Sequence, residues 1–173
     1  MVIKTERLVL RGAQAEDVGP LFEVFGCVET MRYWGTATHV SIMETAQLVD
    51  QIADDDPALS YFVVTRDGRA VGTAGFWQGS EVGFILHRDL WRQGFGEEVL
   101  RALIPYGIDT LGLEEITADV DPDNAASIGL LTKLGFVEMA RAERTLQIGD
   151  RWFDSVYFRL TAPVLSDENG PQD

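Results

Sequence analysis

A pair of glycines separates a predicted buried strand from a predicted helix near the middle of the chain. The strand is expected over residues 81–86, and the helix runs from the turn at Gly94 and Gly96 to about Leu111. Glycines let the backbone bend sharply, which leaves several N–H groups exposed at the positive end of the helix dipole. Such a turn can bind a phosphate group, although a turn that only reverses the chain would need the same glycines.

Helical and strand periodicities alternate around this turn and predict a mixed α/β (α+β) chain. Ser41 and Glu44 form a capping box at the start of a helix. Gly135 is placed as the left-handed residue that ends another. We expect helices at 16–25, 42–53 and 125–134, strands at 5–11, 60–65, 70–77, 81–86 and 115–120, and a final hairpin of 136–147 with 151–160. Residues 1–163 are predicted to form a single domain, followed by a disordered acidic tail at 164–173.

Charge and composition exclude several classes of protein. Acidic residues outnumber basic ones by 28 to 14, so the net charge is -14 and nucleic acid is not an expected partner. The mean field favours a cationic substrate, although acidic surfaces also serve solubility alone. One cysteine excludes an internal disulfide, and with only two histidines beside it no metal site is expected. No apolar run is long enough for a membrane span and no secretory signal is recognisable, so we expect a cytoplasmic protein without a membrane partner.

Two common phosphate-binding motifs do not fit the turn. A dinucleotide fingerprint needs a third glycine, where this chain has Val99. A P-loop needs Gly-Lys-Ser/Thr, which is absent from the sequence. The phosphate would therefore belong to another kind of ligand.

Five segments in order resemble the GNAT superfamily of acyl-CoA-dependent N-acetyltransferases, most closely its RimJ/RimL-type branch. The resemblance extends over about residues 5–160, and no single segment is specific by itself. The segments are Thr5-Glu-Arg-Leu-Val-Leu-Arg11 with Asp17, Met31-Arg-Tyr-Trp-Gly35, Val82-Gly-Phe84, Leu90-Trp-Arg-Gln-Gly-Phe-Gly-Glu-Glu98, and Asn124-Ala-Ala-Ser127 with Lys133-Leu-Gly-Phe136. Trp91 replaces the Arg or Gln that opens the general loop pattern, as it often does in this branch.

The resemblance implies a GNAT fold, with a mostly antiparallel mixed central sheet flanked by helices, and acetyl-CoA as cosubstrate. Backbone N–H groups of the glycine turn would hold the pyrophosphate, and a backbone N–H near Phe84 or Ile85 would polarise the thioester oxygen. Arg88 and Arg92 flank the turn and are candidate phosphate partners, with solvated surface arginines as the alternative. The expected cofactor-binding residues are Phe84, Ile85, Leu86, Arg92, Gln93, Gly94, Phe95, Gly96, Glu97, Asn124 and Ser127.

Three residues are candidates for proton transfer. The tyrosine that many family members use as general acid would fall at Leu131, and the resemblance implies Ser127 in its place. Glu81 is the first candidate for the base that deprotonates the amine, because a charge entering a buried strand needs a reason. Glu143 is the second candidate. The structural alternative for Glu81 is a surface charge at the end of a strand, and the alternative for Glu143 is a cross-strand ion pair.

The acceptor is expected to be a primary amine, either a protein N-terminal α-amine or a small polyamine or drug-like amine. Tyr33 and Trp34 are candidate acceptor-binding residues, although aromatic residues in such a segment often belong to a core. Direct attack within a ternary complex is expected, without an acyl-enzyme. A non-catalytic acyl-CoA sensor is the alternative function, and family analogy implies a possible homodimer.

Overall fold

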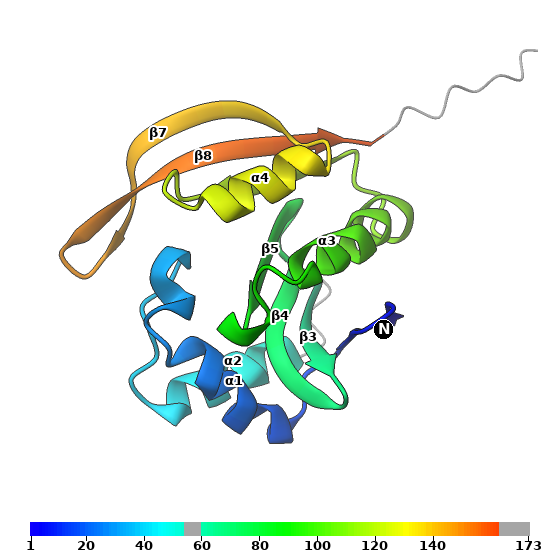
Figure 1. Cartoon of the computed structure of the whole chain (residues 1–173), viewed down its shortest axis with the longest axis vertical. Helices are drawn as coiled ribbons and strands as arrows, with labels where there is room; N and C mark the ends of the chain where they lie inside the picture. Colours follow the sequence, from blue (N-terminus) through cyan, green and yellow to red (C-terminus); the bar gives the residue numbers. More distant parts are fainter. Residues whose placement is uncertain (54–59, 163–173) are drawn as a thin grey trace, which may run out of the picture.

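The computed structural model describes residues 1–53 and 60–162, and its strands form one mixed sheet in the order β1-β2-β3-β4-β5-β6-β8-β7 (Figure 1). Among the strands in these two ranges, only the β5–β6 pair is parallel; the other neighbouring strands are antiparallel. The strands are β1 (Val2–Lys4), β2 (Val9–Arg11), β3 (Ser60–Arg66), β4 (Arg69–Gln78), β5 (Glu81–Leu86), β6 (Glu115–Val120), β7 (Val137–Ile148) and β8 (Arg151–Thr161). This sheet confirms the predicted fold class. The predicted tail at 164–173 lies outside the described residues.

The predicted single strand over residues 5–11 is wrong. The chain turns back between β1 and β2, which pair with each other. The turn is held by Thr5, whose backbone N–H donates to the carbonyl of Leu8 and whose hydroxyl accepts from the N–H of Leu8. Alternation of polar and apolar residues cannot distinguish this turn from an extended segment.

The α-helices of the described residues are α1 (Val18–Phe25), α2 (Ile42–Ala53), α3 (Phe95–Pro105) and α4 (Ala125–Lys133). The helix predicted to reach Leu111 instead widens into a π-helical turn at Tyr106–Thr110. The change follows Pro105, which has no N–H for a regular helical hydrogen bond. Short 3-10 turns at Ala15–Asp17, Thr30–Tyr33 and Arg88–Leu90 were not predicted. Gly135 has the expected positive φ, at 91°. None of the helices in the described ranges is long and apolar enough to cross a membrane.

Two hydrophobic clusters pack on opposite faces of the sheet. One joins Val82 and Leu86 of β5 to α3 and the C-terminal strands. The other joins Ile85 of β5 to α1 and α2. Figure 1 shows α3 and α4 towards the top of the view and α1 and α2 towards the bottom. Alternate residues of β5 therefore face opposite helical layers, as the sequence predicts.

The parallel strands β5 and β6 separate soon after they meet. Their pairing is limited to Glu81 with Thr117, although each strand continues for several residues. On its other edge, β5 pairs with β4 along its whole length. The edge of β5 that faces β6 therefore has backbone groups without strand partners beyond Glu81. Since α3 follows β5 and α4 follows β6, both helices begin at the end of the sheet where this gap opens.

Candidate functional site

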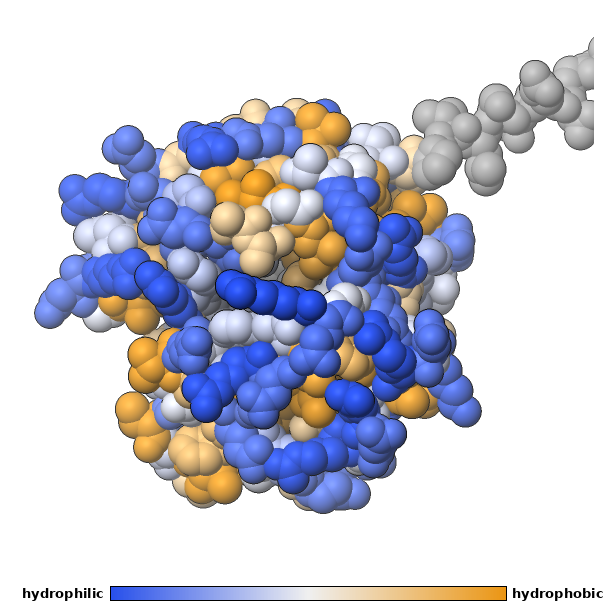
Figure 2. Space-filling model, viewed as in Figure 1, coloured by the Kyte–Doolittle hydropathy of each residue, from blue (hydrophilic) through white to orange (hydrophobic). Residues whose placement is uncertain are grey.

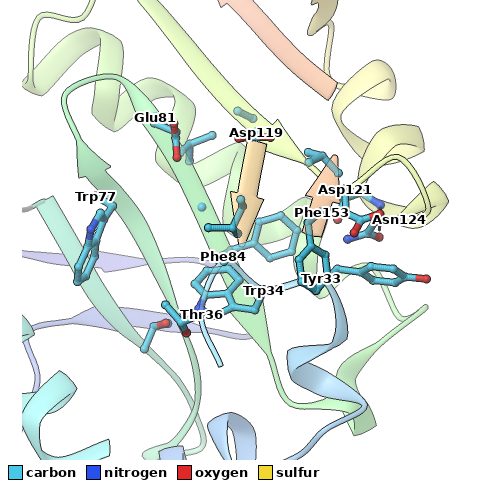
Figure 3. Close-up of a pocket in the computed structure, with 18 of the residues that line it drawn as sticks. Tyr33, Trp34, Thr36, Trp77, Glu81, Phe84, Asp119, Asp121, Asn124 and Phe153 are labelled. Atoms are coloured by element: carbon cyan, nitrogen blue, oxygen red, sulfur yellow. Dashed lines mark hydrogen bonds between the residues drawn. The ribbon is translucent and has the colours of Figure 1, made fainter. Parts of the chain in front are cut away.

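A cavity of about 840 Å³ occupies the gap between β5 and β6 and opens on both faces of the sheet. Its walls come from β3 to β6, from the segment around Trp34, from the start of α4 and from the β7–β8 hairpin. Figure 3 shows the labelled side chains arranged around this space. Hydrophilic residues cover most of the face seen in Figure 2.

The half of the cavity on the α3 and α4 face is largely apolar. Phe84, Ala118, Val120 and Leu131 line it, and the first turn of α4 closes it. Asn124 caps this helix, with its side-chain oxygen accepting from the N–H of Ser127 at 3.2 Å. Asn124 is therefore the N-cap of α4, and the side chains of Asn124 and Ser127 also line the cavity.

The half on the α1 and α2 face is aromatic. Tyr33 and Trp34, the two residues expected from the sequence, both line it, together with Tyr61 and Trp77. Tyr61 and Trp77 meet edge to face, with ring centroids 5.4 Å apart. Gly83 faces Trp34 and Tyr61, because a Cβ there would meet the Trp34 ring at 3.6 Å and the Tyr61 hydroxyl at 3.9 Å. The cavity therefore joins an apolar compartment on one face to an aromatic one on the other.

Glu81 is solvent-exposed and lines the cavity at the point where β5 and β6 still pair. Two effects raise the pKa of Glu81: partial desolvation by neighbouring groups, which is the larger, and repulsion from Asp119. The register that pairs Glu81 with Thr117 places Asp119 two residues further on the adjacent strand and on the same face. Figure 3 shows the two carboxylates on neighbouring strands.

Asp119 was not singled out in the sequence, and the fold holds it by a chain of hydroxyl groups. Ser155 of β8 donates to Asp119 Oδ2 at 3.0 Å, and the hydroxyls of Ser155 and Thr145 are 2.6 Å apart. Desolvation raises the pKa of Asp119, while the bond from Ser155 opposes that rise. Only the pairing of β6 with β8 brings these residues together, so no local sequence signal identifies them.

Glu143, the second candidate base, does not line the cavity. It is exposed on β7, beside a break in the β7–β8 register between Ala142 and Leu146. The cavity wall at this level is instead formed by Thr145 and Leu146. The irregular register, which the sequence does not reveal, decides which residues of this strand face inward.

The glycine turn is shaped as the sequence predicts. Gly94 has a φ of 81° and is the N-cap of α3, and no side chain within the described part of the chain caps this helix start. Arg92 also has a positive φ, at 58°, so two residues just before the helix have a left-handed backbone conformation. Phe95 is 2% exposed and belongs to the core, as do Ile85 and Leu86. These three residues can therefore offer a ligand only their backbone groups.

Arg7 ties the N-terminal segment to this turn. Its Nε donates to Glu98 at 2.7 Å, its Nη1 donates to the backbone oxygen of Gln93 at 3.0 Å, and its guanidinium lies 3.9 Å from the ring centroid of Phe95. Glu98 also accepts from the hydroxyl of Thr5. These contacts explain the role of the polar residues in the opening segment, Thr5 and Arg7. They support the glycine turn and are not part of the predicted single strand.

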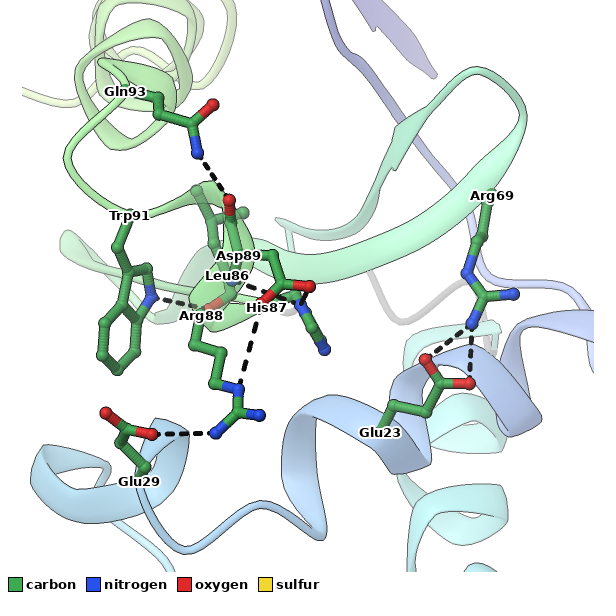
Figure 4. A network of polar contacts seen from close by, with 9 residues as sticks. All are labelled: Glu23, Glu29, Arg69, Leu86, His87, Arg88, Asp89, Trp91 and Gln93. Atoms are coloured by element: carbon green, nitrogen blue, oxygen red, sulfur yellow. Dashed lines mark hydrogen bonds and ion pairs between the residues drawn. The ribbon is translucent and has the colours of Figure 1, made fainter.

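The flanking arginines behave differently from each other. Arg88 donates to Glu29 at 3.0 Å, away from the glycine turn, which favours the structural interpretation of this residue (Figure 4). Trp91 donates its indole N–H to the backbone oxygen of Leu86, and Gln93 donates its side-chain amide to the backbone oxygen of Asp89. These bonds connect the end of β5 to the turn. Arg92 is exposed beside it.

The first turn of α3 fits a phosphate-bearing ligand. Its N–H groups have no side-chain cap, the left-handed Gly94 leaves the approach to them open, and the helix dipole favours an anion there. The apolar compartment leads from the gap between the strands towards the aromatic half of the cavity. Groups of three or more His, Cys, Asp or Glu that could hold a metal ion do not occur in the described residues.

Comparisons with known proteins give a consistent picture. The model of the acetyltransferase (GNAT) domain matches residues 7–137. The "Uncharacterized N-acetyltransferase YoaA" of Bacillus subtilis is 32% identical over 172 residues, which cover 94% of this chain and 97% of the relative.

Two solved structures share the fold at lower identity. The spermidine N-acetyltransferase of Vibrio cholerae, in complex with CoA and spermine, has a TM-score of 0.76 at 21% identity and covers 90% of this chain and 95% of its own. An acetyl transferase of Salmonella typhimurium, which modifies the N-terminal serine of the 50S ribosomal subunit protein L7/L12, has a TM-score of 0.81 at 15% identity. The latter match covers 94% of this chain and 100% of the other.

Proposed function

This chain belongs to the GNAT family of acetyl-CoA-dependent acetyltransferases, and we propose that it acetylates a primary amine by direct attack within a ternary complex. The acceptor is an N-terminal α-amine or a small-molecule amine. Similarity to an acetyl transferase that modifies the N-terminal serine of L7/L12 and to a spermidine N-acetyltransferase supports this range. We place the chain in the RimJ/RimL-type branch on its sequence segments, with residues 1–163 as one catalytic domain.

Backbone N–H groups of Gln93, Gly94, Gly96 and Glu97 bind the pyrophosphate of acetyl-CoA in this proposal. The uncapped start of α3 supports the assignment, because an anion there completes hydrogen bonds that no side chain makes within the described residues. Asn124 has its side-chain oxygen engaged at the cap, so its amide N–H groups are the part that can donate to the pantetheine arm. Lys133 is bound to Glu97 at 2.6 Å and is not assigned a role.

Acetyl-CoA supplies a thioester whose carbonyl carbon accepts the amine. An alkylammonium group has a pKa of about 10 and must lose a proton before it attacks. We assign that proton to Glu81, whose raised pKa makes it a stronger base than an ordinary surface carboxylate. Free N–H groups on the edge of β5 that faces β6 donate to the carbonyl oxygen as charge develops there.

Ser127 donates a proton or a hydrogen bond to the departing sulfur in this scheme. It lines the same compartment as Leu131, the position where a tyrosine would have served. The position of Leu131 also favours the alternative of a non-catalytic acyl-CoA sensor, because its side chain cannot act as an acid. Glu143 has no role in this proposal, since it is exposed outside the cavity.

One observation carries the proposal: a single cavity passes between the diverging strands and joins Ser127 and Asn124 to Glu81. Acetyl-CoA is expected to raise the Tm of the protein, whereas NAD and ATP are not. Free thiol is then expected when acetyl-CoA is mixed with members of a panel of peptides, polyamines and other amines. Thermal stabilisation without thiol release from any amine would favour the sensor instead.

A further inference from the structure

Among the described residues, five carboxylates line the cavity: Glu44, Glu81, Asp119, Asp121 and Asp154. Elsewhere many acidic residues are neutralised, as Asp17 is by Arg11 and Glu98 is by Arg7. Within the described residues, none of the five cavity carboxylates forms an ion pair with Lys, Arg or His. The negative charge of this cavity is therefore left for a ligand to balance.

The described cavity walls also contain no Lys or Arg. His39 is the lining residue that could become positive, and its surroundings disfavour that form. It stacks on Phe25 with ring centroids 5.1 Å apart, its Nδ1 lies 2.9 Å from the hydroxyl of Thr45, and desolvation lowers its pKa. A neutral His39 leaves the carboxylates without a positive group among the lining residues.

An independent observation points to a ligand-binding position in the aromatic compartment. Thr73 is fully buried and lines the cavity, and its hydroxyl has no hydrogen-bond partner among the described residues. The Tyr61 hydroxyl lies near that of Thr73, and their interaction opposes the rise in the pKa of Tyr61 that burial causes, but the two groups do not meet full hydrogen-bonding geometry. An unpartnered buried hydroxyl is costly, and a ligand N–H would satisfy it.

The aromatic residues identify the chemical nature of that ligand. Trp34, Tyr61 and Trp77 line the compartment, and aromatic rings attract organic cations. A metal ion is a poor alternative, because the carboxylates do not converge into a metal-binding group within the described ranges. A ligand with an apolar spacer between two cationic groups would match this cavity, with the spacer beside the aromatic rings and the cationic groups beside the separated carboxylates.

We propose that the acceptor is a flexible organic amine with at least two cationic nitrogens, one at Glu81 and Asp119 and another held by the carboxylates farther along the cavity. The inference rests on the proposed acetyl transfer and specifies its substrate class. The reacting nitrogen loses its proton to Glu81 and forms the bond to the acetyl carbon, while the carbon–sulfur bond breaks and the thiolate leaves. The second nitrogen stays charged and takes no part in bond formation.

Two amines of similar length test the proposal: 1,4-diaminobutane, with two charges, and 1-aminopentane, in which a methyl group replaces the second ammonium. We expect kcat/KM to be at least about tenfold higher for the diamine at low salt, and the ratio to decrease as salt screens the charges. Similar kcat/KM values for the two amines would overturn the proposal, as would a monocationic N-terminal peptide used better than the diamine.

Variants locate the second nitrogen. In Glu44→Gln/Asp154→Asn, two charges disappear, while oxygens remain to accept from the N–H groups of Val40 and Arg144. This double variant is expected to lower kcat/KM about tenfold for the diamine and to change it less than twofold for 1-aminopentane. Asp150→Asn, which removes one charge from the exposed turn of the same hairpin, is the control for the Asp154→Asn change and should affect neither amine. Equal losses for both amines in the double variant would contradict a second cationic subsite.

A binding measurement separates this inference from the proposed transfer. With CoA bound, the diamine should raise the Tm more than 1-aminopentane does, whether or not turnover occurs. Turnover of both amines without preference would refute only the second subsite. Preferential binding of the diamine without thiol release would retain the subsite and refute the transfer, and equal binding would refute the subsite in either case.

Discussion

Replacing Arg7 by Met should weaken acetyl-CoA binding without affecting the acetyl transfer itself. The Met side chain leaves apolar bulk beside Phe95 but removes the guanidinium, with its bonds to Glu98 and to the backbone oxygen of Gln93 and its contact with the Phe95 ring. Glu98 remains bound to Thr5 and to the backbone N–H of residue 7. The perturbation is therefore confined to the support of the glycine turn.

The size of the effect follows from exposure and geometry. A hydrogen bond to a charged group contributes about 1.5–3 kcal/mol when buried, whereas an exposed ion pair contributes about 0.2–1 kcal/mol. The Arg7 side chain is 39% exposed, so solvent screening places its pair with Glu98 near the lower range. The second bond and the contact with the ring bring the total to about 1–2 kcal/mol. If the turn must be held in place to bind pyrophosphate, KM for acetyl-CoA should rise by about 5- to 30-fold.

The assay is thiol release under varied acetyl-CoA at saturating amine, with kcat and the KM for the amine measured in parallel. Arg66→Met is the matched control, because the Arg66 guanidinium lies 5.0 Å from the same Phe95 ring and has no hydrogen bond to the turn. The control removes the same charge from the same region. It should leave KM for acetyl-CoA within about twofold of the wild type, while Arg7→Lys should restore part of the loss.

Two results would refute this reasoning. If KM for acetyl-CoA is unchanged in Arg7→Met, the turn keeps its geometry without the clamp. If Arg66→Met raises KM as much as Arg7→Met does, then the effect is one of long-range charge rather than of positioning. A fall in kcat with unchanged KM would assign Arg7 to a step other than cosubstrate binding.

Two further predictions concern the base and the turn. Glu81→Gln should lower kcat by about 10²- to 10⁴-fold and remove the acid limb of the pH profile of kcat/KM. Desolvation and Asp119 raise the pKa of Glu81, which must be deprotonated to act as a base, so wild-type activity falls as pH decreases through that raised pKa. An acid limb at the same pH in the variant would assign the role of base to another group. Gly94→Val should raise KM for acetyl-CoA and lower the Tm, because a φ of 81° costs a β-branched residue at least about 1–2 kcal/mol. A variant with wild-type KM and Tm would show that the turn does not need this conformation.

The order of helices and strands was largely predictable because it depends on local patterns. The helix start after Ser41, the helix end at Gly135 and the alternation along β5 each depend on a few neighbouring residues. At the helix start, Ser41 Oγ accepts from the N–H of Met43 and Glu44 from that of Val40, so the predicted reciprocal capping box is not formed. The prediction for residues 5–11 was wrong because local patterns do not record distant contacts. The turn in this segment is stabilised by Glu98, 93 residues from Thr5, and a contact of that range leaves no periodicity in the sequence.

The candidate site was less predictable because side chains from separate strands form it. Glu81 and Ser127 were found through residue type and motif, and both line the cavity. Asp119 was missed, because its significance depends on the register of β5 with β6 and of β6 with β8. Glu143 was misplaced because an irregularity in β7 changes which residues face inward.

The acidic cavity has to bind a cation and also accept a proton from it, and these demands act in opposite directions on Glu81. A bound ammonium stabilises the carboxylate and lowers its pKa, which weakens the base. Two features of the fold reduce this conflict. Asp119 shares the attraction to the reacting ammonium while its repulsion still raises the pKa of Glu81. A second ammonium held farther away by Glu44 and Asp154 adds binding energy without contacting Glu81. On this argument, removing the distal carboxylates should affect KM for a diamine far more than the position of the acid limb, whereas Asp119→Asn should move that limb to lower pH.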